Sequence, residues 1–188
     1  MFGEAVRRLI MHLTQGWADG RHDTIQYWEI GNEPDLEVFG GPWPVEFYSL
    51  LYAAAAKAVK SLEPPVGHPP YKVGGPALAY LRGWEKPFLE YCDAHEVPLD
   101  FFSFHAYLDD PNEYRTIIRQ ACDLVRQYPQ YQDTMLSLNE WNLCGETSDK
   151  RPVTPRSGPP ENADARGRFA PRATRPIRHS SPFGIAVW

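Results

Sequence analysis

The sequence of 188 residues is poor in cysteine and has no long apolar run. Its three cysteines, Cys92, Cys122 and Cys144, lie far apart, which excludes a disulfide framework and a cysteine metal cluster. No apolar segment approaches the roughly 20 residues that a membrane-spanning helix requires. The chain starts with an amphipathic segment, so we expect no secretion signal and no membrane partner, and the sequence indicates no compartment.

Positive charge is also scarce, because 19 Lys and Arg residues stand against 24 Asp and Glu residues, for a net charge of −5. This balance argues against a protein that binds nucleic acid by neutralising phosphates. Residues 145–188 differ from the rest, with eight basic and four acidic residues and seven of the 19 prolines. We expect this segment to be a disordered or non-native tail, with a basic arm for an acidic partner as the alternative.

Residues 1–144 alternate four short segments rich in β-branched and aromatic residues with four segments of helical periodicity. The predicted strands are 24–30, 71–75, 99–105 and 134–139, and the predicted helices are 6–17, 42–62, 84–95 and 112–128. Such alternation indicates βα units and a parallel sheet, as in doubly wound folds and (β/α)8 barrels. No glycine-rich phosphate loop follows a strand, whereas polar residues stand at the strand ends, which favours a barrel with its active rim.

Two glutamates, Glu33 and Glu140, each follow an asparagine at the end of a different predicted strand. Two carboxylates on one barrel rim can serve as general acid/base and nucleophile in glycosidic-bond cleavage, with one protonated and the other ionised. The alternative is structural, with Glu33 capping a helix and Glu140 pairing with an arginine. Several aromatic side chains near these strand ends would suit sugar rings, namely Trp28, Phe39, Trp43, Tyr107 and Trp141.

The motifs themselves resemble those of a known enzyme family. Tyr-Trp-Glu-Ile-Gly-Asn-Glu-Pro-Asp at 27–35 is similar to the acid/base motif of the clan A retaining glycoside hydrolases, which ends their fourth barrel strand. Three more segments follow in the order of strands five, six and seven, at 72–77, 100–107 and 138–142. The combination is most similar to glycoside hydrolase family 39, the β-xylosidase and α-L-iduronidase family, over about residues 5–144.

The resemblance implies a role for each matching residue. Glu33 corresponds to the acid/base and Glu140 to the nucleophile of a double displacement on a carbohydrate substrate, without metal or other cofactor. Asn32 corresponds to the residue that binds the sugar 2-hydroxyl. His105 and Tyr107 correspond to residues near the carboxylates and substrate, with a histidine that only packs at the rim as the alternative for His105. Trp141 corresponds either to a residue that forms the bottom of the sugar subsite or to one that packs beside the seventh strand.

The sequence departs from the family at both ends of the pattern. The acid/base strand should be the fourth, yet only one predicted helix precedes it, and no eighth strand follows residue 142. We therefore predict an α/β chain with a partial (β/α)8 TIM barrel, about strands 4 to 7, in a catalytic domain over 1–144. Under this prediction Met1 is an internal or mispredicted start of the protein. Residues 145–188 then come from a shifted reading frame or an unrelated exon.

Two other functions remain open for such a chain. One is a non-catalytic carbohydrate-binding remnant of a glycosidase, which would keep the aromatic residues without the complete barrel. The other is a (β/α)8 hydrolase that uses a metal, against which stands the lack of a His-x-His pair or carboxylate cluster at metal-ligand spacing.

Overall fold

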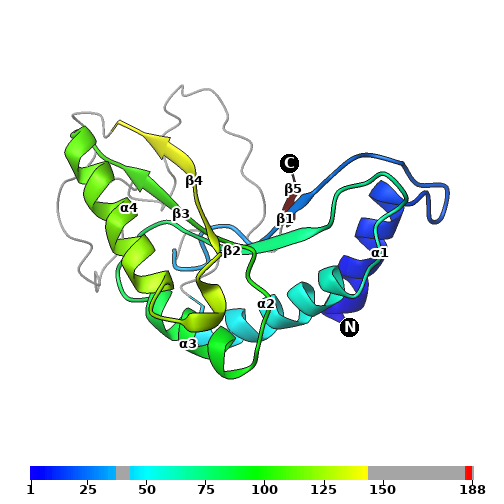
Figure 1. Cartoon of the computed structure of the whole chain (residues 1–188), viewed down its shortest axis with the longest axis horizontal. Helices are drawn as coiled ribbons and strands as arrows, with labels where there is room; N and C mark the ends of the chain where they lie inside the picture. The colour runs from blue at the N-terminus through cyan, green and yellow to red at the C-terminus, as the bar shows by residue number, and fades with distance from the viewer. Residues whose placement is uncertain (37–42, 144–184, 188) are drawn as a thin grey trace, which may run out of the picture. The chain divides into compact units, whose positions relative to one another are not determined.

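The computed structural model describes residues 1–36, 43–143 and 185–187 of the chain (Figure 1). The described elements, in chain order, are α1 (Phe2–Thr14), β1 (Tyr27–Ile30), α2 (Val45–Lys60), β2 (Lys72–Leu78), α3 (Glu85–Ala94), β3 (Phe101–Tyr107), α4 (Pro111–Val125), the 3-10 helix η2 (Pro129–Tyr131), β4 (Met135–Asn142) and β5 (Ile185–Val187). Phe39, Cys144 and nearly all of the segment 145–188 that we expect to be disordered lie outside the described residues.

The strands form one sheet in the order β4-β3-β2-β1-β5. β1 to β4 run parallel to one another, and each is joined to the next by a connection that contains a helix. This arrangement confirms the predicted α/β fold class with its run of βα units. β5, which the sequence pattern does not predict, runs antiparallel along the other edge of β1, where Glu29 pairs with Ala186.

The strand boundaries differ from the prediction where the regular ladder is interrupted. β2 continues past Pro76 to Leu78, although the sequence predicts that the proline ends the strand. The register of β2 against β3 shifts between Pro76 and Leu78, so Ala77 has no residue opposite it. Proline has no N–H to give to a ladder and is accepted at such a bulge. β4 likewise runs to Asn142, three residues beyond its predicted end.

The helices lie along one side of the sheet and cover its core-facing side chains (Figure 1). α2 carries the centre of this core, because its Tyr48 and Tyr52 are buried against Phe88 of α3, with ring centroids 5.7 and 5.1 Å apart. The two tyrosine hydroxyls donate hydrogen bonds to opposite ends of the sheet. That of Tyr48 reaches the carbonyl of Ile30 at 2.5 Å, and that of Tyr52 reaches the carbonyl of Pro98 at 2.9 Å.

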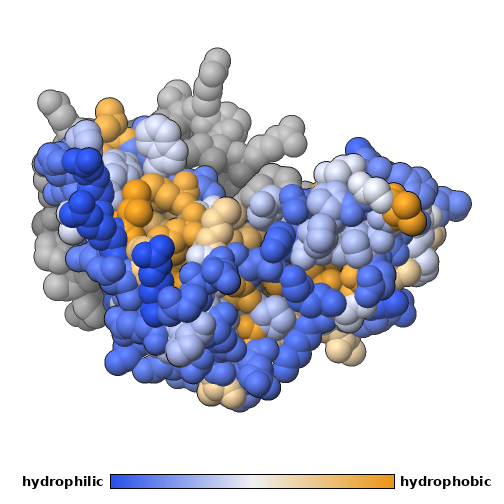
Figure 2. Space-filling view, viewed as in Figure 1, coloured by the Kyte–Doolittle hydropathy of each residue, from blue (hydrophilic) through white to orange (hydrophobic). Residues whose placement is uncertain are grey.

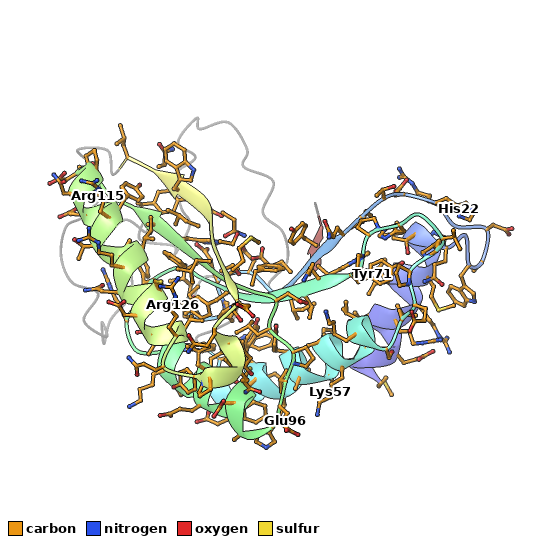
Figure 3. All side chains as sticks on the ribbon, in the orientation of Figure 1. His22, Lys57, Tyr71, Glu96, Arg115 and Arg126 are labelled. Atoms are coloured by element: carbon orange, nitrogen blue, oxygen red, sulfur yellow. The ribbon has the colours of Figure 1, made fainter. Side chains whose placement is uncertain are left out.

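α4 is less buried than its sequence suggests. The pattern predicts a buried face of six residues, yet only Ala121 and Val125 are fully buried, and Ile118 is 40% exposed. Asp110 begins the helix as its N-cap, since its Oδ1 accepts a hydrogen bond from the backbone N–H of Asn112 at 2.8 Å. Arg115 on this helix and Arg126, the C-cap residue that follows it, are exposed, and Figure 3 labels both.

Charged residues hold the amino ends of the strands together. Asp100, just before β3, accepts hydrogen bonds from the Nζ atoms of Lys60 and Lys72 at 3.0 and 3.3 Å. Its other contact is the backbone N–H of Val73, which donates to Oδ2 at 2.8 Å. One carboxylate thus joins α2, β2 and the start of β3 at the end of the sheet that, in barrel folds, serves stability.

β4 is an edge strand among the described residues, because its one partner there is β3. Three large apolar residues are exposed along or just beyond it, Met135, Trp141 and Leu143. Figure 2 shows apolar side chains at the surface over this part of the molecule. Such an edge can pair with another chain, so we expect aggregation to compete with folding. Separately, no helix among the described residues has the length and apolar character to cross a membrane.

Candidate active site at the carboxyl ends of the parallel strands

A left-handed turn after β1 places Glu33. Gly31 and Glu33 have φ angles of +89° and +46°, and the backbone N–H of Glu33 donates to the carbonyl of Ala77 at 2.9 Å. A non-glycine residue in this region costs about 1 kcal/mol or more, and such residues cluster at functional sites. Glu33 is 9% exposed, and Asn32 lies half-buried beside it in the same turn.

β3 presents His105 and Tyr107 on one face of the sheet, as expected for residues two positions apart in a strand. His105 is 2% exposed, and its Nδ1 lies 3.0 Å from Oε1 of Glu33 and 3.7 Å from Oε2 of Glu140. The Tyr107 hydroxyl donates a short hydrogen bond to Oε1 of Glu140. Burial, and then this contact with a carboxylate, raise the pKa of Tyr107 well above its usual range, so the phenol keeps its proton.

A register shift in β4 brings Glu140 to the same place. Phe104 lies opposite Leu138 and His105 lies opposite Glu140, which leaves Asn139 as an extra residue of the strand. Bulges of this kind re-aim side chains next to active sites. The Glu140 side chain is 44% exposed, so its carboxylate can be reached from solvent.

The structure therefore brings together four of the six residues that the sequence singles out. Glu33, His105 and Glu140 each offer an atom within 4.8 Å of the other two, and Tyr107 bonds to Glu140. Two carboxyl groups about 5–5.5 Å apart are typical of retaining glycosidases, whereas inverting enzymes place them about 6.5–9.5 Å apart. In this structure one carboxylate oxygen of Glu33 lies within 4.8 Å of one of Glu140, and the retaining mechanism stays a prediction.

The aromatic residues are distributed differently from the expectation. Trp28 is completely buried in the core, edge-on to Tyr71 at 6.3 Å, so it cannot contact a sugar. Trp43 packs against Phe47 with ring centroids 5.2 Å apart. Trp141 is 67% exposed and follows Glu140, so strand alternation directs it to the other face, and its contact with sugar stays a prediction.

Sequence reasoning missed a buried carboxylate beneath the site. Glu29 of β1 is 2% exposed, and both of its carboxylate oxygens accept hydrogen bonds from Nδ2 of Asn139, at 2.8 and 2.9 Å. Burial raises the pKa of Glu29 above its ordinary value, against hydrogen bonds from Ser103 and Asn139 that lower it. The available signal was a single acidic residue within the apolar strand Tyr27–Ile30.

Asp35 is a second carboxylate that the sequence did not single out. Its two oxygens accept hydrogen bonds from the backbone N–H groups of Ala79 and Tyr80, at 3.0 and 3.2 Å. It thereby ties the turn that carries Glu33 to the segment that follows β2. Burial raises the pKa of Asp35 above its ordinary value.

The same cluster is where the described residues could bind a cation. Glu33, His105 and Glu140 are a set of metal-ligating types with one atom each within 4.8 Å. Two carboxylates and an imidazole also suffice for acid–base and nucleophilic chemistry without an ion. The absence of a metal from the reaction stays a prediction.

A parallel α/β sheet with two facing carboxylates at the carboxyl ends of its strands is the architecture of barrel enzymes that cleave glycosidic bonds. Residues 3–143 match the family model described as glycosyl hydrolases family 39, and the chain belongs to this family of glycosidases. The family that the motifs resemble is thus confirmed.

Two beta-xylosidases have sequence similarity to this chain. The chain is 32% identical over 110 residues to a beta-xylosidase of Caldicellulosiruptor saccharolyticus, covering 58% of this chain and 21% of the relative. It is 38% identical over 88 residues to a beta-xylosidase of Geobacillus stearothermophilus, covering 45% of this chain and 16% of the relative.

Solved structures share the fold. A glucosidase from Croceicoccus marinus matches with a TM-score of 0.68 and 32% identity, over 80% of this chain and 32% of that structure. A family 39 beta-xylosidase from Caulobacter crescentus matches with a TM-score of 0.58 and 22% identity, over 80% and 30%. The chain therefore spans less than a third of the length of these relatives, and its four parallel strands are part of a (β/α)8 barrel.

Proposed function

We propose that this chain carries the catalytic rim of a retaining glycosidase that hydrolyses β-xylosides or closely similar glycosides. The observation that supports this most directly is that one side-chain atom each of Glu33, His105 and Glu140 lies within 4.8 Å of the other two, although these residues come from the turn after β1, from β3 and from β4. The names of the two beta-xylosidases guide the choice of sugar. Asn32 and Trp141 complete the proposed substrate-binding set.

In the proposed reaction Glu140 is the nucleophile, because its carboxylate is exposed and can approach an anomeric carbon. Its oxygen forms a bond to that carbon while the bond to the leaving oxygen breaks, and Glu33 gives the leaving oxygen its proton. A water then attacks the glycosyl ester and loses a proton to Glu33, which frees Glu140 as a carboxylate. The sugar leaves with its anomeric configuration retained.

The neighbours of the two glutamates fit these roles. Tyr107 donates a hydrogen bond to Oε1 of Glu140, which holds the carboxyl of the proposed nucleophile in place. His105 lies at hydrogen-bond distance from Glu33 and holds its carboxyl in the turn after β1. Each carboxyl thus has its own close partner, which supports the assignment of two separate roles.

The second candidate is a carbohydrate-binding remnant without turnover. It is favoured by the fact that the chain spans less than a third of the relatives, because a barrel site normally draws on all eight strands. In that case the rim would bind a sugar but form no glycosyl ester.

An aryl β-xyloside with a good leaving group tests the proposal. We expect the 188-residue chain to release the phenol, Glu140→Ala to abolish release, and azide to restore it by attacking the vacant anomeric face. Glu33→Ala should spare the first release of phenol, because this leaving group needs no proton, whereas steady-state turnover should slow, because the water that attacks the glycosyl ester has lost its base. A chelator should have no effect. Xylose binding without phenol release from the wild-type chain would support the remnant instead.

A further inference from the structure

The backbone is irregular directly beneath both proposed catalytic glutamates. Ala77 of β2 is an extra residue with a φ of +53°, and its carbonyl holds the Glu33 N–H. Asn139 of β4 is also an extra residue, and it directly precedes Glu140. Neither bulge receives its support from the regular ladder, so something else must fix both of them.

One buried side chain is connected to both bulges. The N–H of Ala77 donates to Oγ of Ser103 at 3.0 Å, and the Ser103 side chain is close enough to the Glu29 carboxyl to lower its pKa. The same carboxylate accepts from Nδ2 of Asn139 with both oxygens. A series of neighbouring polar groups therefore runs from the backbone of Glu33 through Ala77, Ser103 and Glu29 to Asn139, the residue before Glu140.

From this juxtaposition we infer that Glu29 is a positioning residue, which fixes the distance between the two glutamates by holding the bulges of β2 and β4. The inference rests on the proposed function and adds a part that Glu29 plays in it. Glu29 is too deeply buried, at 2% exposure, to touch a substrate. It acts through Ser103, which is also buried, and through the amide of Asn139.

The chemistry of the contacts explains why a carboxylate is needed here. Glu29 faces the amide N–H2 of Asn139 and the hydroxyl of Ser103, and each of its two carboxyl oxygens can accept a hydrogen bond. A glutamine would turn one of the two oxygens into an N–H2 group, which would meet another donor. The Asn139 amide would then lose part of its support, and Glu140 would be free to move relative to His105.

The test compares three variants of the full 188-residue chain with the wild type. Glu29→Gln breaks the donor–acceptor pattern, and Glu29→Gln with Asn139→Asp restores it with the roles exchanged. Tyr131→Phe is the control, because it removes a buried hydrogen bond to the carbonyl of Val97 at 2.8 Å, away from the carboxyl ends of the strands. The readouts are the imidazole ¹⁵N NMR signals of His105 and, separately, kcat and KM on an aryl β-xyloside.

We expect Glu29→Gln to shift the His105 nitrogen signals and to lower kcat about 10- to 100-fold with KM changed less than about twofold, as for a small misplacement of reacting groups. The double variant should move both readouts back toward the wild type, and Tyr131→Phe should move neither. Unchanged His105 signals in Glu29→Gln, or shifted signals with wild-type kcat, would overturn the inference. If the wild-type chain turns over no glycoside, the proposed function fails, and the nitrogen signals still decide whether Glu29 holds the site.

Discussion

Two tyrosines one turn apart in α2 allow a matched test of how the core supports the site. Tyr48→Phe removes the hydroxyl that donates to the carbonyl of Ile30 at 2.5 Å. Ile30 is the last residue of β1, before the turn that carries Glu33. Tyr52→Phe removes the equivalent hydroxyl, which donates to the Pro98 carbonyl at 2.9 Å, before β3. Both side chains are buried, so the two variants delete the same group from similar surroundings.

The size of the effect follows from the acceptor that is left behind. A buried carbonyl that loses its hydrogen bond keeps its desolvation penalty, which costs about 1–3 kcal/mol. Burial raises the pKa of Tyr48 well above its ordinary value, so the hydroxyl is a neutral donor and no charge is lost. We expect a free energy of unfolding lower by about 1–2 kcal/mol in both variants.

The two variants should differ in activity. The Ile30 carbonyl lies three residues before Glu33, so Tyr48→Phe should also lower turnover of an aryl β-xyloside several-fold, while Tyr52→Phe should leave it at the wild-type value. Proteolysis in increasing urea at low protein concentration measures stability without aggregation. A loss below about 0.5 kcal/mol for Tyr48→Phe, or equal turnover in both variants, would refute this reasoning.

Three further predictions concern the site and the open sheet. Tyr107→Phe removes the hydrogen-bond donor to Glu140. Hydrogen bonds to charged groups contribute about 1.5–3 kcal/mol and this one is partly exposed, so kcat should fall about 10-fold. An unchanged kcat in steady-state kinetics would mean that the contact does not contribute to catalysis. Because burial raises the pKa of Glu29, the folded chain holds a proton that the unfolded chain releases near pH 4.3, and this contribution to stability is lost as pH rises through the folded pKa. Glu29→Gln lacks that loss, so its stability relative to the wild type should improve with rising pH, and parallel urea curves at pH 4 and 7 would contradict this. The isolated chain should melt broadly and at a temperature that depends on its concentration, because among the described residues β4 pairs on one side alone and carries exposed apolar side chains; a sharp, reversible calorimetric transition would contradict this.

The sequence allows the strand ends to be located because the pattern and the chemistry coincide there. Glu33 and Glu140 follow apolar, β-branched or aromatic segments, and the parallel order of such segments predicts that their ends meet at one edge. His105 was predicted on the same argument. To place these residues at the site, a prediction needs only the correct strand and the correct end of that strand. An error of one residue in a strand boundary still leaves them at the same edge of the sheet.

Other features depend on contacts that no local pattern contains. The extra residues Ala77 and Asn139 arise from a register shift of one residue between neighbouring strands, which periodicity within a single strand cannot indicate. Glu29 pairs with a residue 110 positions away, so its burial is intelligible only in the folded sheet. The partial exposure of Ile118 has a similar origin, because the helical period predicts a face but not how much of that face the sheet covers.

The Asp100 cluster has a consequence for engineering. Asp100, Lys60 and Lys72 join helix and strands at the amino ends, whereas the proposed chemistry lies at the carboxyl ends. The two ends share no residue, so sequence changes at one need not be compensated at the other. A library that randomises the segment after β2, around Tyr80 and Arg82, therefore allows a search for variants with a different sugar preference. The Asp100 cluster at the amino ends of the strands stays unchanged in such a library.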